Sequence, residues 1–417
     1  MYIHRQIETE LRPFLERKEA VALLGPRQAG KTTLMRHIAE EWEKNGKKVK
    51  FITLEKRSDL ELFQDSIEDF KSLVEDYDCV IIDEFQYAKD GGQKLKYLYD
   101  TTGIKFIISG SSSLELRFQT GKYMVGRLFD FKFLPFSFRE FLSVADTELF
   151  VLLNKQIDPA SFLRFHAKKG FGPAINKRLA GRLEDYIVYG GYPAVVLSKT
   201  GSEKQKVLES IIEKYLLRDI KGLLNLATDD DLIRLSKFLS TQVGGLINFN
   251  ELSNASGLNY KSVLQHLNIL ERTFIIELIR PFFTNRRTEL VKNQKNYFVD
   301  LGVRNFLISD FRRLEKRDDA GSVMENYAYN LLSRLLPSSK MKYWRTKSGA
   351  EVDFVVETEG GVCPIEVKYA STRIVGKSFY SFIEKFKPKV GVILTKDFWG
   401  EEKIGKATVK FIPLSYF

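Results

Sequence analysis

A glycine-rich run near the N-terminus, Gly25–Thr32, constrains the fold of this chain more than any other feature. It reads Gly-Pro-Arg-Gln-Ala-Gly-Lys-Thr and fits the phosphate-binding loop pattern G-x-x-x-x-G-K-S/T. The apolar run Ala20–Leu24 before it predicts a buried strand, and apolar residues recur at helical spacing over Thr33–Trp42 after it. Strand, loop and helix in this order are the context that a phosphate loop requires, and a chance glycine turn has no need of them.

The residue types of this loop suit a nucleoside triphosphate. Gly25 and Gly30 let the backbone turn so that its N–H groups point at a phosphate, and the helix N-terminus adds partial positive charge. Lys31 is expected to reach the β- and γ-phosphates, and the Thr32 hydroxyl to ligate Mg²⁺. The residues expected to bind ATP are Gly25, Pro26, Arg27, Gln28, Ala29, Gly30, Lys31, Thr32 and Thr33.

A second signal is the apolar run Asp78–Glu84, which reads as a strand ending in two acids. Asp83 is expected to hold the Mg²⁺ shell, usually through water. Glu84 stands where a carboxylate can polarise the water that attacks the γ-phosphate. The alternative is a charge pair at a helix N-terminus, which is less fitting after a phosphate loop.

Two more strands and an arginine complete the first predicted domain. Lys48–Leu54 and Lys105–Ile108 read as strands, and strands alternating with helical stretches predict a parallel sheet covered by helices. Ser111, in the run Ser109–Ser113, is the expected sensor of the γ-phosphate, with a plain Gly/Ser turn as the alternative. Arg127 could stabilise charge on the γ-phosphate, within the chain or across a subunit contact, or could close a surface salt bridge.

Composition narrows the class of protein. A chain of 417 residues, 44% hydrophobic and 29% charged, predicts a globular protein of two to four domains. No apolar run has the length of a membrane span, and the polar start is no signal peptide. Cys79 and Cys363 are far apart and show no zinc-like spacing with the four histidines, so we expect a cytoplasmic protein. The net charge of +11 favours a polyanionic partner, or reflects a well-solvated basic surface.

The middle of the chain predicts two helical parts. Residues 143–240 read as a helical lid or linker, interrupted at Gly190–Pro193. Residues 241–305 have the sequence pattern of a winged helix-turn-helix. In this pattern Asn250–Ala255 is a short helix, and Asn259 caps the next helix.

The second helix of this unit, Tyr260–Glu271, is expected to bury one face and to present the other to DNA. The expected core residues are Val263, Leu264, Leu267 and Leu270, and the expected DNA-facing residues are Tyr260, Lys261 and Gln265. Thr273–Leu278 and Asn296–Asp300 read as wing strands. The basic residues between them, expected to contact phosphates, are Arg286, Arg287, Lys292 and Lys295. The alternative is a module for packing or oligomerisation.

Residues 306–417 carry a second chemical constellation, which strand periodicity brings together. Glu366 and Lys368 lie two apart and project from one face of a strand, as Glu351 and Asp353 do on the strand before. A hairpin can therefore place Asp353, Glu366 and Lys368 at one end of a sheet.

Two carboxylates can hold a divalent metal there, while a lysine orients or activates a water. Glu325 could reach the same site from a packed helix. The constellation resembles the PD-(D/E)xK nuclease fold, with Asp353 as its metal acid and Glu366-Val367-Lys368 as its E-x-K step, although the proline usual before the acid is absent. The alternative is a cross-strand set of salt bridges on an inert sheet.

The ordered motifs also resemble the AAA-type ATPases of the AAA_14/DUF4143 family of bacteria and archaea. The matching segments are Gly25–Leu34, Ile82–Gln86, Ser109–Leu114, Gly126–Arg127, Leu134–Phe141 and Tyr189–Pro193. The resemblance covers nearly the whole chain and implies ATP binding and hydrolysis. It implies little about biological role.

We therefore expect an α/β protein with four parts. These are a P-loop AAA-type domain with a parallel sheet at 1–142, a helical lid at 143–240, a winged helix at 241–305 and a restriction-endonuclease-like domain at 306–417. The expected activity is Mg²⁺-dependent ATP hydrolysis with Glu84, Lys31 and Arg127 as catalytic residues. We expect coupling to DNA or another nucleic acid, no membrane partner, and a homo-oligomer as one possible state. The alternatives are an ATP-gated, metal-dependent DNA nuclease and a non-catalytic ATP-binding switch.

Overall fold

The computed structural model describes residues 2–111, 122–156, 170–213, 230–283, 289, 292–336, 341–358 and 361–417. Contacts divide the chain into two compact units. The first unit comprises residues 1–136, 192–194 and 267–275, and the second comprises residues 137–191, 195–266 and 276–417.

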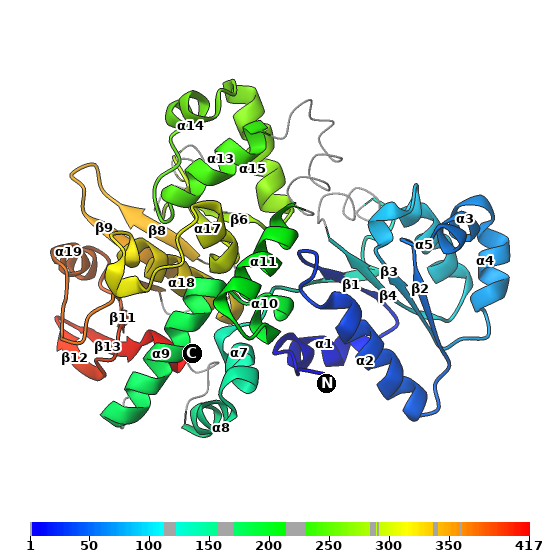
Figure 1. Ribbon diagram of the computed structural model, residues 1–417, viewed down its shortest axis with the longest axis horizontal. Helices are drawn as coiled ribbons and strands as arrows, with labels where there is room; N and C mark the ends of the chain where they lie inside the picture. The colour runs from blue at the N-terminus through cyan, green and yellow to red at the C-terminus, as the bar shows by residue number, and fades with distance from the viewer. Residues whose placement is uncertain are drawn as a thin grey trace. The chain divides into compact units, whose positions relative to one another are not determined.

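The first unit is built on a five-stranded sheet in which every strand pair is parallel (Figure 1). The strands are β1 (Ala20–Leu24), β2 (Val49–Thr53), β3 (Cys79–Asp83), β4 (Lys105–Gly110) and β5 (Leu128–Lys132), in the order β2-β3-β4-β1-β5. The prediction of an α/β fold with a parallel sheet is therefore confirmed. Because all strands run the same way, their carboxyl ends meet at a single edge of the sheet.

Helices cover both faces of this sheet because its central strands are apolar on both sides. Val21 and Leu23 pack with α1 (Ile7–Leu15) and α2 (Lys31–Lys44). Ala20, Ala22 and Leu24 pack on the other face, where the helices are α3 (Arg57–Asp65), α4 (Ile67–Val74) and α5 (Gly91–Thr101). A short 3₁₀ helix, η1 (Phe85–Tyr87), follows β3.

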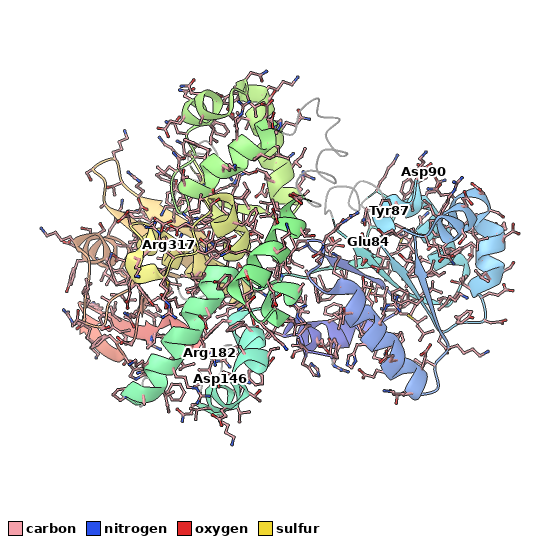
Figure 2. The ribbon with its side chains drawn as sticks, viewed as in Figure 1. Glu84, Tyr87, Asp90, Asp146, Arg182 and Arg317 are labelled. Atoms are coloured by element: carbon pink, nitrogen blue, oxygen red, sulfur yellow. The ribbon has the colours of Figure 1, made fainter. Side chains whose placement is uncertain are left out.

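The second unit begins with helices, as the sequence predicts. They are α7 (Phe138–Ala145), α8 (Thr147–Gln156), α9 (Pro173–Tyr189), α11 (Gly201–Ile212) and α13 (Asp230–Thr241), while α10 (Pro193–Leu197) spans the boundary between the units. The Asp146 carboxylate, after α7, accepts hydrogen bonds from Arg178 and Arg182 of α9 (Figure 2). This ion-pair set ties α9 to the end of α7.

The expected interruption after α9 has a structural cause. Gly190 has φ +81°, and a Cβ there would lie 2.2 Å from a carboxylate oxygen of Asp300. The same carboxylate accepts hydrogen bonds from the N–H groups of Gly191 and Val303, so Asp300 also caps α17 (Leu301–Leu307). Burial raises the pKa of Asp300 to about 6. Glycine is thus needed where the chain leaves α9 against Asp300.

Two helices and a two-stranded antiparallel ladder follow α13. They are α14 (Phe249–Ser256), α15 (Tyr260–Arg272), β6 (Ile276–Ile279) and β7 (Lys295–Phe298). The predicted cap of α15 is confirmed, because Asn259 Oδ1 accepts the N–H of Ser262 at 2.9 Å. The winged-helix interpretation itself stays a prediction.

The expected core face of α15 needs one correction. Val263, Leu267 and Leu270 are buried, but Leu264 is 42% exposed and His266 is buried in its place. Positions 263, 266, 267 and 270 follow the helical repeat more closely than position 264, which lies at the margin of the stripe.

The C-terminal part contains a six-stranded mixed sheet in the order β12-β13-β11-β10-β9-β8 (Figure 1). Its elements are η4 (Leu314–Lys316), α18 (Ala320–Leu335), β8 (Met341–Arg345), β9 (Glu351–Thr358), β10 (Gly361–Lys368), α19 (Lys377–Phe386), β11 (Val390–Thr395), β12 (Gly400–Ile404), β13 (Ala407–Pro413) and η6 (Leu414–Tyr416). Strands β8, β9 and β10 form an antiparallel meander, and β11 is parallel to β10. Helix α18 packs on one face of the sheet and α19 on the other.

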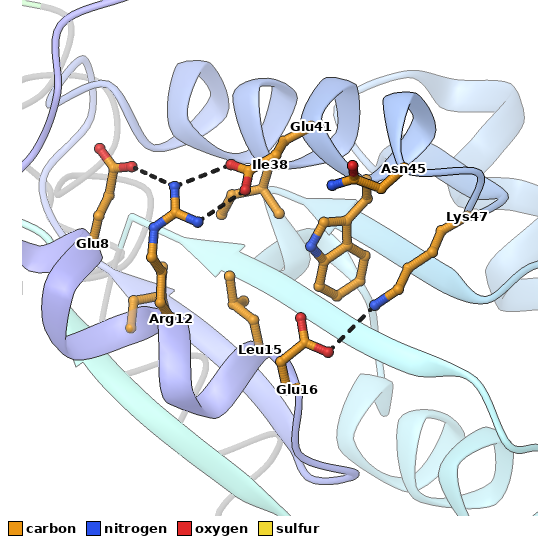
Figure 3. Close-up of a pocket in the computed structure, with 10 residues that line it drawn as sticks. Glu8, Arg12, Leu15, Glu16, Ile38, Glu41, Asn45 and Lys47 are labelled. Atoms are coloured by element: carbon orange, nitrogen blue, oxygen red, sulfur yellow. Dashed lines mark hydrogen bonds and ion pairs between the residues drawn. The ribbon is translucent and has the colours of Figure 1, made fainter.

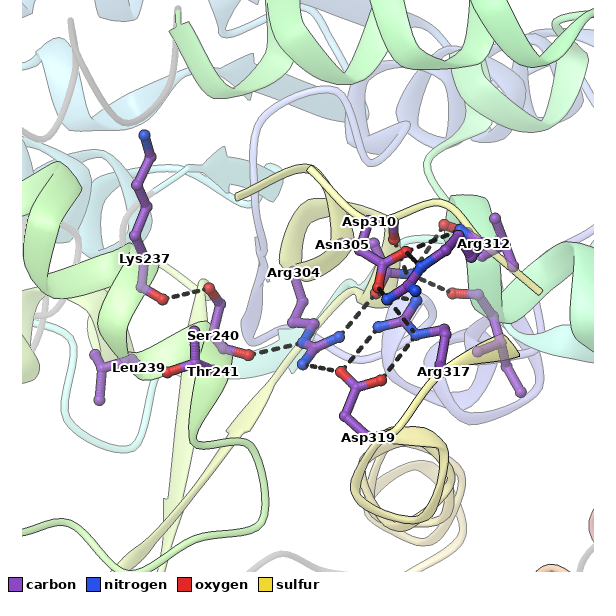
Figure 4. Close-up of polar contacts among 12 residues, drawn as sticks. Lys237, Leu239, Ser240, Thr241, Arg304, Asn305, Asp310, Arg312, Arg317 and Asp319 are labelled. Carbon is purple, nitrogen blue, oxygen red and sulfur yellow. Dashed lines mark hydrogen bonds and ion pairs between the residues drawn. The ribbon is translucent and has the colours of Figure 1, made fainter. Parts of the chain in front are cut away.

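A buried polar network joins α17 to the start of α18 (Figure 4). Asp319 accepts hydrogen bonds from Arg304 at 2.5 Å and from Arg317 at 2.8 and 3.0 Å. Asn305 Oδ1 accepts from both arginines. Burial of Asp319 alone would raise its pKa, but hydrogen bonds and charge from these arginines outweigh burial and hold the pKa below its ordinary value.

Across the described helices, none combines the length and apolar character needed to cross a membrane.

Candidate nucleotide site

The predicted ATP-binding residues meet at the carboxyl edge of the parallel sheet. The loop Gly25–Gly30 leaves the end of β1 and enters α2, and Asp83 is the last residue of β3. Strand β4 lies between β1 and β3, so Ser109 and Ser111 at its end stand between the loop and the acids. Ser111 is the predicted sensor of the γ-phosphate, and its place beside both parts of the site suits that prediction.

Both glycines of the loop pattern are required, for different reasons. A Cβ on Gly25 would lie 1.7 Å from the carbonyl oxygen of Phe133, because the backbone passes directly beside the chain that leaves β5. Gly30 has φ +101° at the N-cap of α2, a left-handed conformation that other residues rarely adopt. Both constraints act where the chain turns from β1 into α2.

Lys31, the first residue of α2, has its ammonium inside the loop. Nζ donates to the carbonyl oxygens of Gly25 at 2.8 Å and Pro26 at 2.9 Å. Burial lowers the pKa of Lys31 to about 8, and the nearby carboxylates of Glu84 and Asp83 oppose this decrease. A γ-phosphate at the loop would supply the negative charge that favours the ammonium form.

Thr32 and Asp83, the two predicted Mg²⁺ ligands, are in direct contact. Thr32 Oγ1 donates to Asp83 Oδ2 at 2.6 Å. Asp83 Oδ1 accepts from the backbone N–H of Glu84 at 3.1 Å and from the Ser109 hydroxyl. A hydroxyl and a carboxylate are oxygen ligands that suit Mg²⁺, which takes its remaining ligands from phosphates and water.

Thr32 and Asp83 supply only two oxygen ligands, which are too few to bind a metal ion with protein groups alone. Within the described ranges, no group of three or more His, Cys, Asp or Glu side chains is arranged to hold a metal ion. Mg²⁺ at Thr32 and Asp83 would accordingly depend on the nucleotide for the rest of its coordination.

Glu84 is held by a residue to which the sequence analysis assigned no role, Gln86. Glu84 has φ +55°, and its Oε2 accepts a hydrogen bond from Gln86 Nε2. The same Nε2 donates to Ser111 Oγ at 3.1 Å, and the Ser111 N–H donates to Gln86 Oε1 at 3.4 Å. Gln86 thus links the predicted catalytic carboxylate to the predicted sensor. Figure 2 labels Glu84 and, three residues on, Tyr87.

Two arginines make contacts at the loop, one from within it and one from outside. Arg27, a loop residue, donates to the Tyr87 hydroxyl at 2.5 Å. Arg5 donates to the carbonyl oxygens of Ala29 at 3.0 Å and Leu134 at 2.6 Å, and its guanidinium lies over the Phe133 ring. Arg5 was missed because a single arginine before the first strand carries no motif. Of the other loop residues, Gln28 has φ +60° and Thr33 is exposed on α2.

The structure does not bring Arg127 to this site within the chain. Arg127 precedes β5, whose first residue pairs with Ala20 at the start of β1, whereas the phosphate loop follows the end of β1. Its Nε pairs with Asp100 Oδ1 at 3.0 Å. Arg127 therefore lies at the opposite edge of the sheet, in the salt bridge that the sequence analysis gave as the alternative. Ser112 and Ser113 lie outside the described residues.

A cavity of about 440 Å³ between α1 and α2 is separate from the phosphate loop (Figure 3). Its apolar lining includes Leu15, Ile38 and Trp42, and its rim carries the ion pairs Arg12–Glu41 and Glu16–Lys47. The α2 residues that line it lie in the second half of the helix, and the phosphate loop meets the first turn. The cavity is thus no part of the predicted nucleotide site.

The C-terminal residues of the predicted nuclease-like site also come together. Asp353 on β9 accepts the N–H of Val367 at 2.7 Å, and Lys368 pairs with Glu366 Oε1 at 2.7 Å on β10. Burial raises the pKa of Asp353 to about 8, and Glu325 on α18 adds to this increase. The order α18-β8-β9-β10-α19-β11 carries these residues, and the nuclease-like interpretation stays a prediction.

One expected wing residue lies elsewhere. Lys295 is 1% exposed, and its Nζ pairs with Glu325 Oε1 at 2.9 Å and Glu351 Oε1 at 2.5 Å. The expectation of a solvent-facing phosphate contact at Lys295 is wrong, because its ammonium is directed into carboxylates. Lys292 is exposed, and Arg286 and Arg287 lie outside the described residues.

Comparison with family models and known proteins divides the chain into three matched segments. Residues 17–142 match an AAA domain, AAA_14; residues 180–315 match a domain of unknown function, DUF8612; and residues 320–417 match a domain of unknown function, DUF4143. An uncharacterized protein of Mycobacterium tuberculosis is 25% identical over 381 residues, which cover 90% of this chain and 76% of the relative. An uncharacterized protein of Methanocaldococcus jannaschii is 24% identical over 426 residues, covering 96% of this chain and 85% of the relative.

Solved structures with partial similarity include two proteins of Aeropyrum pernix. The ORC2 protein in its ADP form has a TM-score of 0.35 and 14% identity, with 80% of this chain and 95% of that chain covered. The ORC1 protein in complex with DNA has a TM-score of 0.33 and 13% identity, with 74% and 93% covered. From the family matches and the parallel sheet, the chain carries an N-terminal AAA domain of the AAA_14 family and a C-terminal domain of the DUF4143 family.

Proposed function

We propose that this protein binds ATP with Mg²⁺ and hydrolyses it at the carboxyl edge of the β2-β3-β4-β1-β5 sheet. The observation that carries the proposal is the 2.6 Å contact between Thr32 Oγ1 and Asp83 Oδ2. It joins the phosphate loop to the acid strand, which are distant in sequence. Glu84 follows Asp83 directly, so phosphate binding, metal binding and water activation have their residues in one site.

Each group has a defined task in the proposed reaction. The loop N–H groups and the Lys31 ammonium bind the β- and γ-phosphates, and Mg²⁺ would be held by Thr32 and Asp83. The Glu84 carboxylate orients the attacking water and accepts its proton. Ser111 would contact the γ-phosphate, and its hydrogen bond to Gln86 would couple that contact to the position of the Glu84 carboxylate.

Substitution of Lys31 tests the proposal at its first step. Lys31→Ala removes the charged donor from the loop, so we expect ATP affinity to fall about 100-fold, equivalent to about 3 kcal/mol, and turnover to be lost. The matched control is Lys44→Ala, which removes an exposed lysine from the end of the same helix. Fluorescent ATP titration and phosphate release are measured for both variants. Equal affinity and turnover in Lys31→Ala and the parent contradict the proposal.

A role for Arg127 in hydrolysis is proposed only together with a homo-oligomer. Its position at the amino edge of the sheet keeps it from the nucleotide of its own chain, so it could act only on that of a second copy. Mass measurement of the full chain with and without ATP tests this role, and a monomer under both conditions would remove it.

We also propose that ATP hydrolysis is coupled to the binding of a nucleic acid. Its support is the net charge of +11 and the exposed side chains of Tyr260, Lys261 and Gln265 on α15. ATP turnover with single-stranded DNA, duplex DNA and no DNA tests it, with the DNA watched for cleavage. Mg²⁺- or Mn²⁺-dependent cutting lost in Asp353→Ala and Lys368→Ala would favour the ATP-gated nuclease. Nucleotide binding without turnover under every condition would favour a switch.

A further inference from the structure

Four carboxylates from α18, β9 and β10 lie in one region of the C-terminal sheet, although no three acidic side chains of the described residues are arranged, as they stand, to hold a metal ion. We call Glu325, Glu351, Asp353 and Glu366 the C-terminal carboxylate cluster. Glu366 is 4% exposed, and its Oε2 is buried with no hydrogen-bond partner among the described residues. Its Oε1 pairs with Lys368. Arg345 pairs with Glu351 Oε2 at 2.9 Å, so Lys368 and Arg345 each offset one carboxylate of the cluster.

The chain supplies a third cation to this cluster, and this one is buried. Lys295 enters from β7, and its Nζ lies 2.9 Å from Glu325 Oε1 and 2.5 Å from Glu351 Oε1. The Tyr297 hydroxyl donates to the same Glu325 oxygen at 2.7 Å. The Nζ also lies 5.6 Å from the centroid of the Tyr343 ring, within the range of a cation–π contact. Carboxylate oxygens and an aromatic ring thus surround a single buried ammonium.

We propose that the Lys295 ammonium is the resident cation of the C-terminal carboxylate cluster, and that a divalent cation binds there only when this ammonium is removed. The reason is steric and electrostatic. A divalent ion binds carboxylate oxygens at about 2.0–2.6 Å, and an ammonium already in contact with two of the carboxylates repels a second cation. The cluster then works as an internal ion network that fixes β7 to the C-terminal sheet.

A buried lysine is stable only if its partners replace the hydration that it loses. Glu325 and Glu351 come from different elements, α18 and β9, so Lys295 connects three segments of the chain. Removal of the ammonium leaves carboxylates that repel one another in a buried site. A divalent cation is the ligand that would relieve this repulsion.

Mn²⁺ binding to the full chain without nucleotide, followed by electron paramagnetic resonance, tests the proposal. An Asp83→Asn parent removes the metal site proposed at the phosphate loop. We expect this parent to bind no Mn²⁺ at the C-terminal carboxylate cluster. Adding Asp353→Asn to it should therefore leave its Mn²⁺ binding unchanged. We expect Lys295→Met to bind an additional Mn²⁺ with an affinity raised at least about 100-fold, and to lose it again when combined with Asp353→Asn. Lys295→Arg is the matched control, because it keeps a cation and gains no Mn²⁺.

Two results would overturn the proposal. One is Mn²⁺ binding by the parent that Asp353→Asn removes, and the other is a folded Lys295→Met variant that gains no Mn²⁺. Circular dichroism reports folding, and we expect Mn²⁺ to raise the melting temperature of Lys295→Met but not that of the parent. If Lys295→Met does not fold, Mn²⁺ binding by the Asp83→Asn parent is the deciding measurement. Mn²⁺ binding that Asp353→Asn removes would reject the proposal, and the absence of such binding would support it.

Discussion

At the scale of single residues, the nucleotide site was predictable where chemistry demands one residue type at a fixed spacing. Gly30, Lys31 and Thr32 follow from the loop pattern, and Asp83 from its place at the end of an apolar strand. Gln86 was not predictable in the same way. An amide has no charge and no fixed spacing rule, so only its contacts with Glu84 and Ser111 indicate what it does.

Gln86→Ala tests whether Gln86 positions the Glu84 carboxylate. Removal of the amide frees this carboxylate to rotate, and we expect kcat to fall about tenfold because a misplaced base abstracts a proton less efficiently. The dissociation constant for ATP should stay within about twofold of the parent value, since Gln86 has no predicted contact with phosphate. Stopped-flow nucleotide binding and steady-state turnover separate the two quantities. A parallel loss of affinity and kcat would assign Gln86 to binding, contrary to this interpretation.

At the scale of elements, periodicity predicted the strands and helices well and their surroundings less well. The strand runs around β1, β3 and β4 were found because they are continuously apolar. Lys295 was expected to face solvent because a lysine in a loop-like segment usually does. Its burial depends on Glu325 and Glu351, which are remote in sequence and whose proximity no local pattern reveals.

The buried network around Asp319 gives a prediction at this scale (Figure 4). Asp319→Ala leaves the side chains of Arg304 and Arg317, 1% and 0% exposed, without their shared carboxylate. We expect the free energy of unfolding of the second unit to fall by about 3 kcal/mol or more. Arg312→Ala is the control, because Arg312 is 59% exposed in its ion pair with Asp310 and should change stability by less than about 1 kcal/mol. Urea unfolding measures both, and equal effects would contradict the importance of burial.

At the scale of the whole molecule, composition indicated a class of partner but not a surface. The net charge of +11 is compatible with nucleic acid, and α15 offers exposed Tyr260 and Lys261. Sequence could predict the cap at Asn259 because it depends on residues three apart.

A double substitution tests this partner class. We expect Tyr260→Ala combined with Lys261→Ala to weaken binding of a fluorescent DNA duplex about tenfold, because two contacts to the phosphate backbone, from a hydroxyl and from an ammonium, are lost together. Affinity for the duplex should also fall as salt concentration rises. Lys44→Ala, on α2, is the control for a general loss of positive charge. Unchanged affinity in the double variant would remove α15 from the proposed interface.

The central claim is that the phosphate loop and the Asp83–Glu84 pair form a single ATP-hydrolysing site, and Glu84→Gln tests it most directly. Glutamine keeps the shape of the side chain but cannot accept the proton of the attacking water, so binding and turnover should separate. We expect the dissociation constant for ATP to stay within about twofold of the parent value and phosphate release to fall at least about 100-fold. Glu43→Gln, an exposed change on α2, should leave both unchanged. Phosphate release by Glu84→Gln at the parent rate would contradict the account.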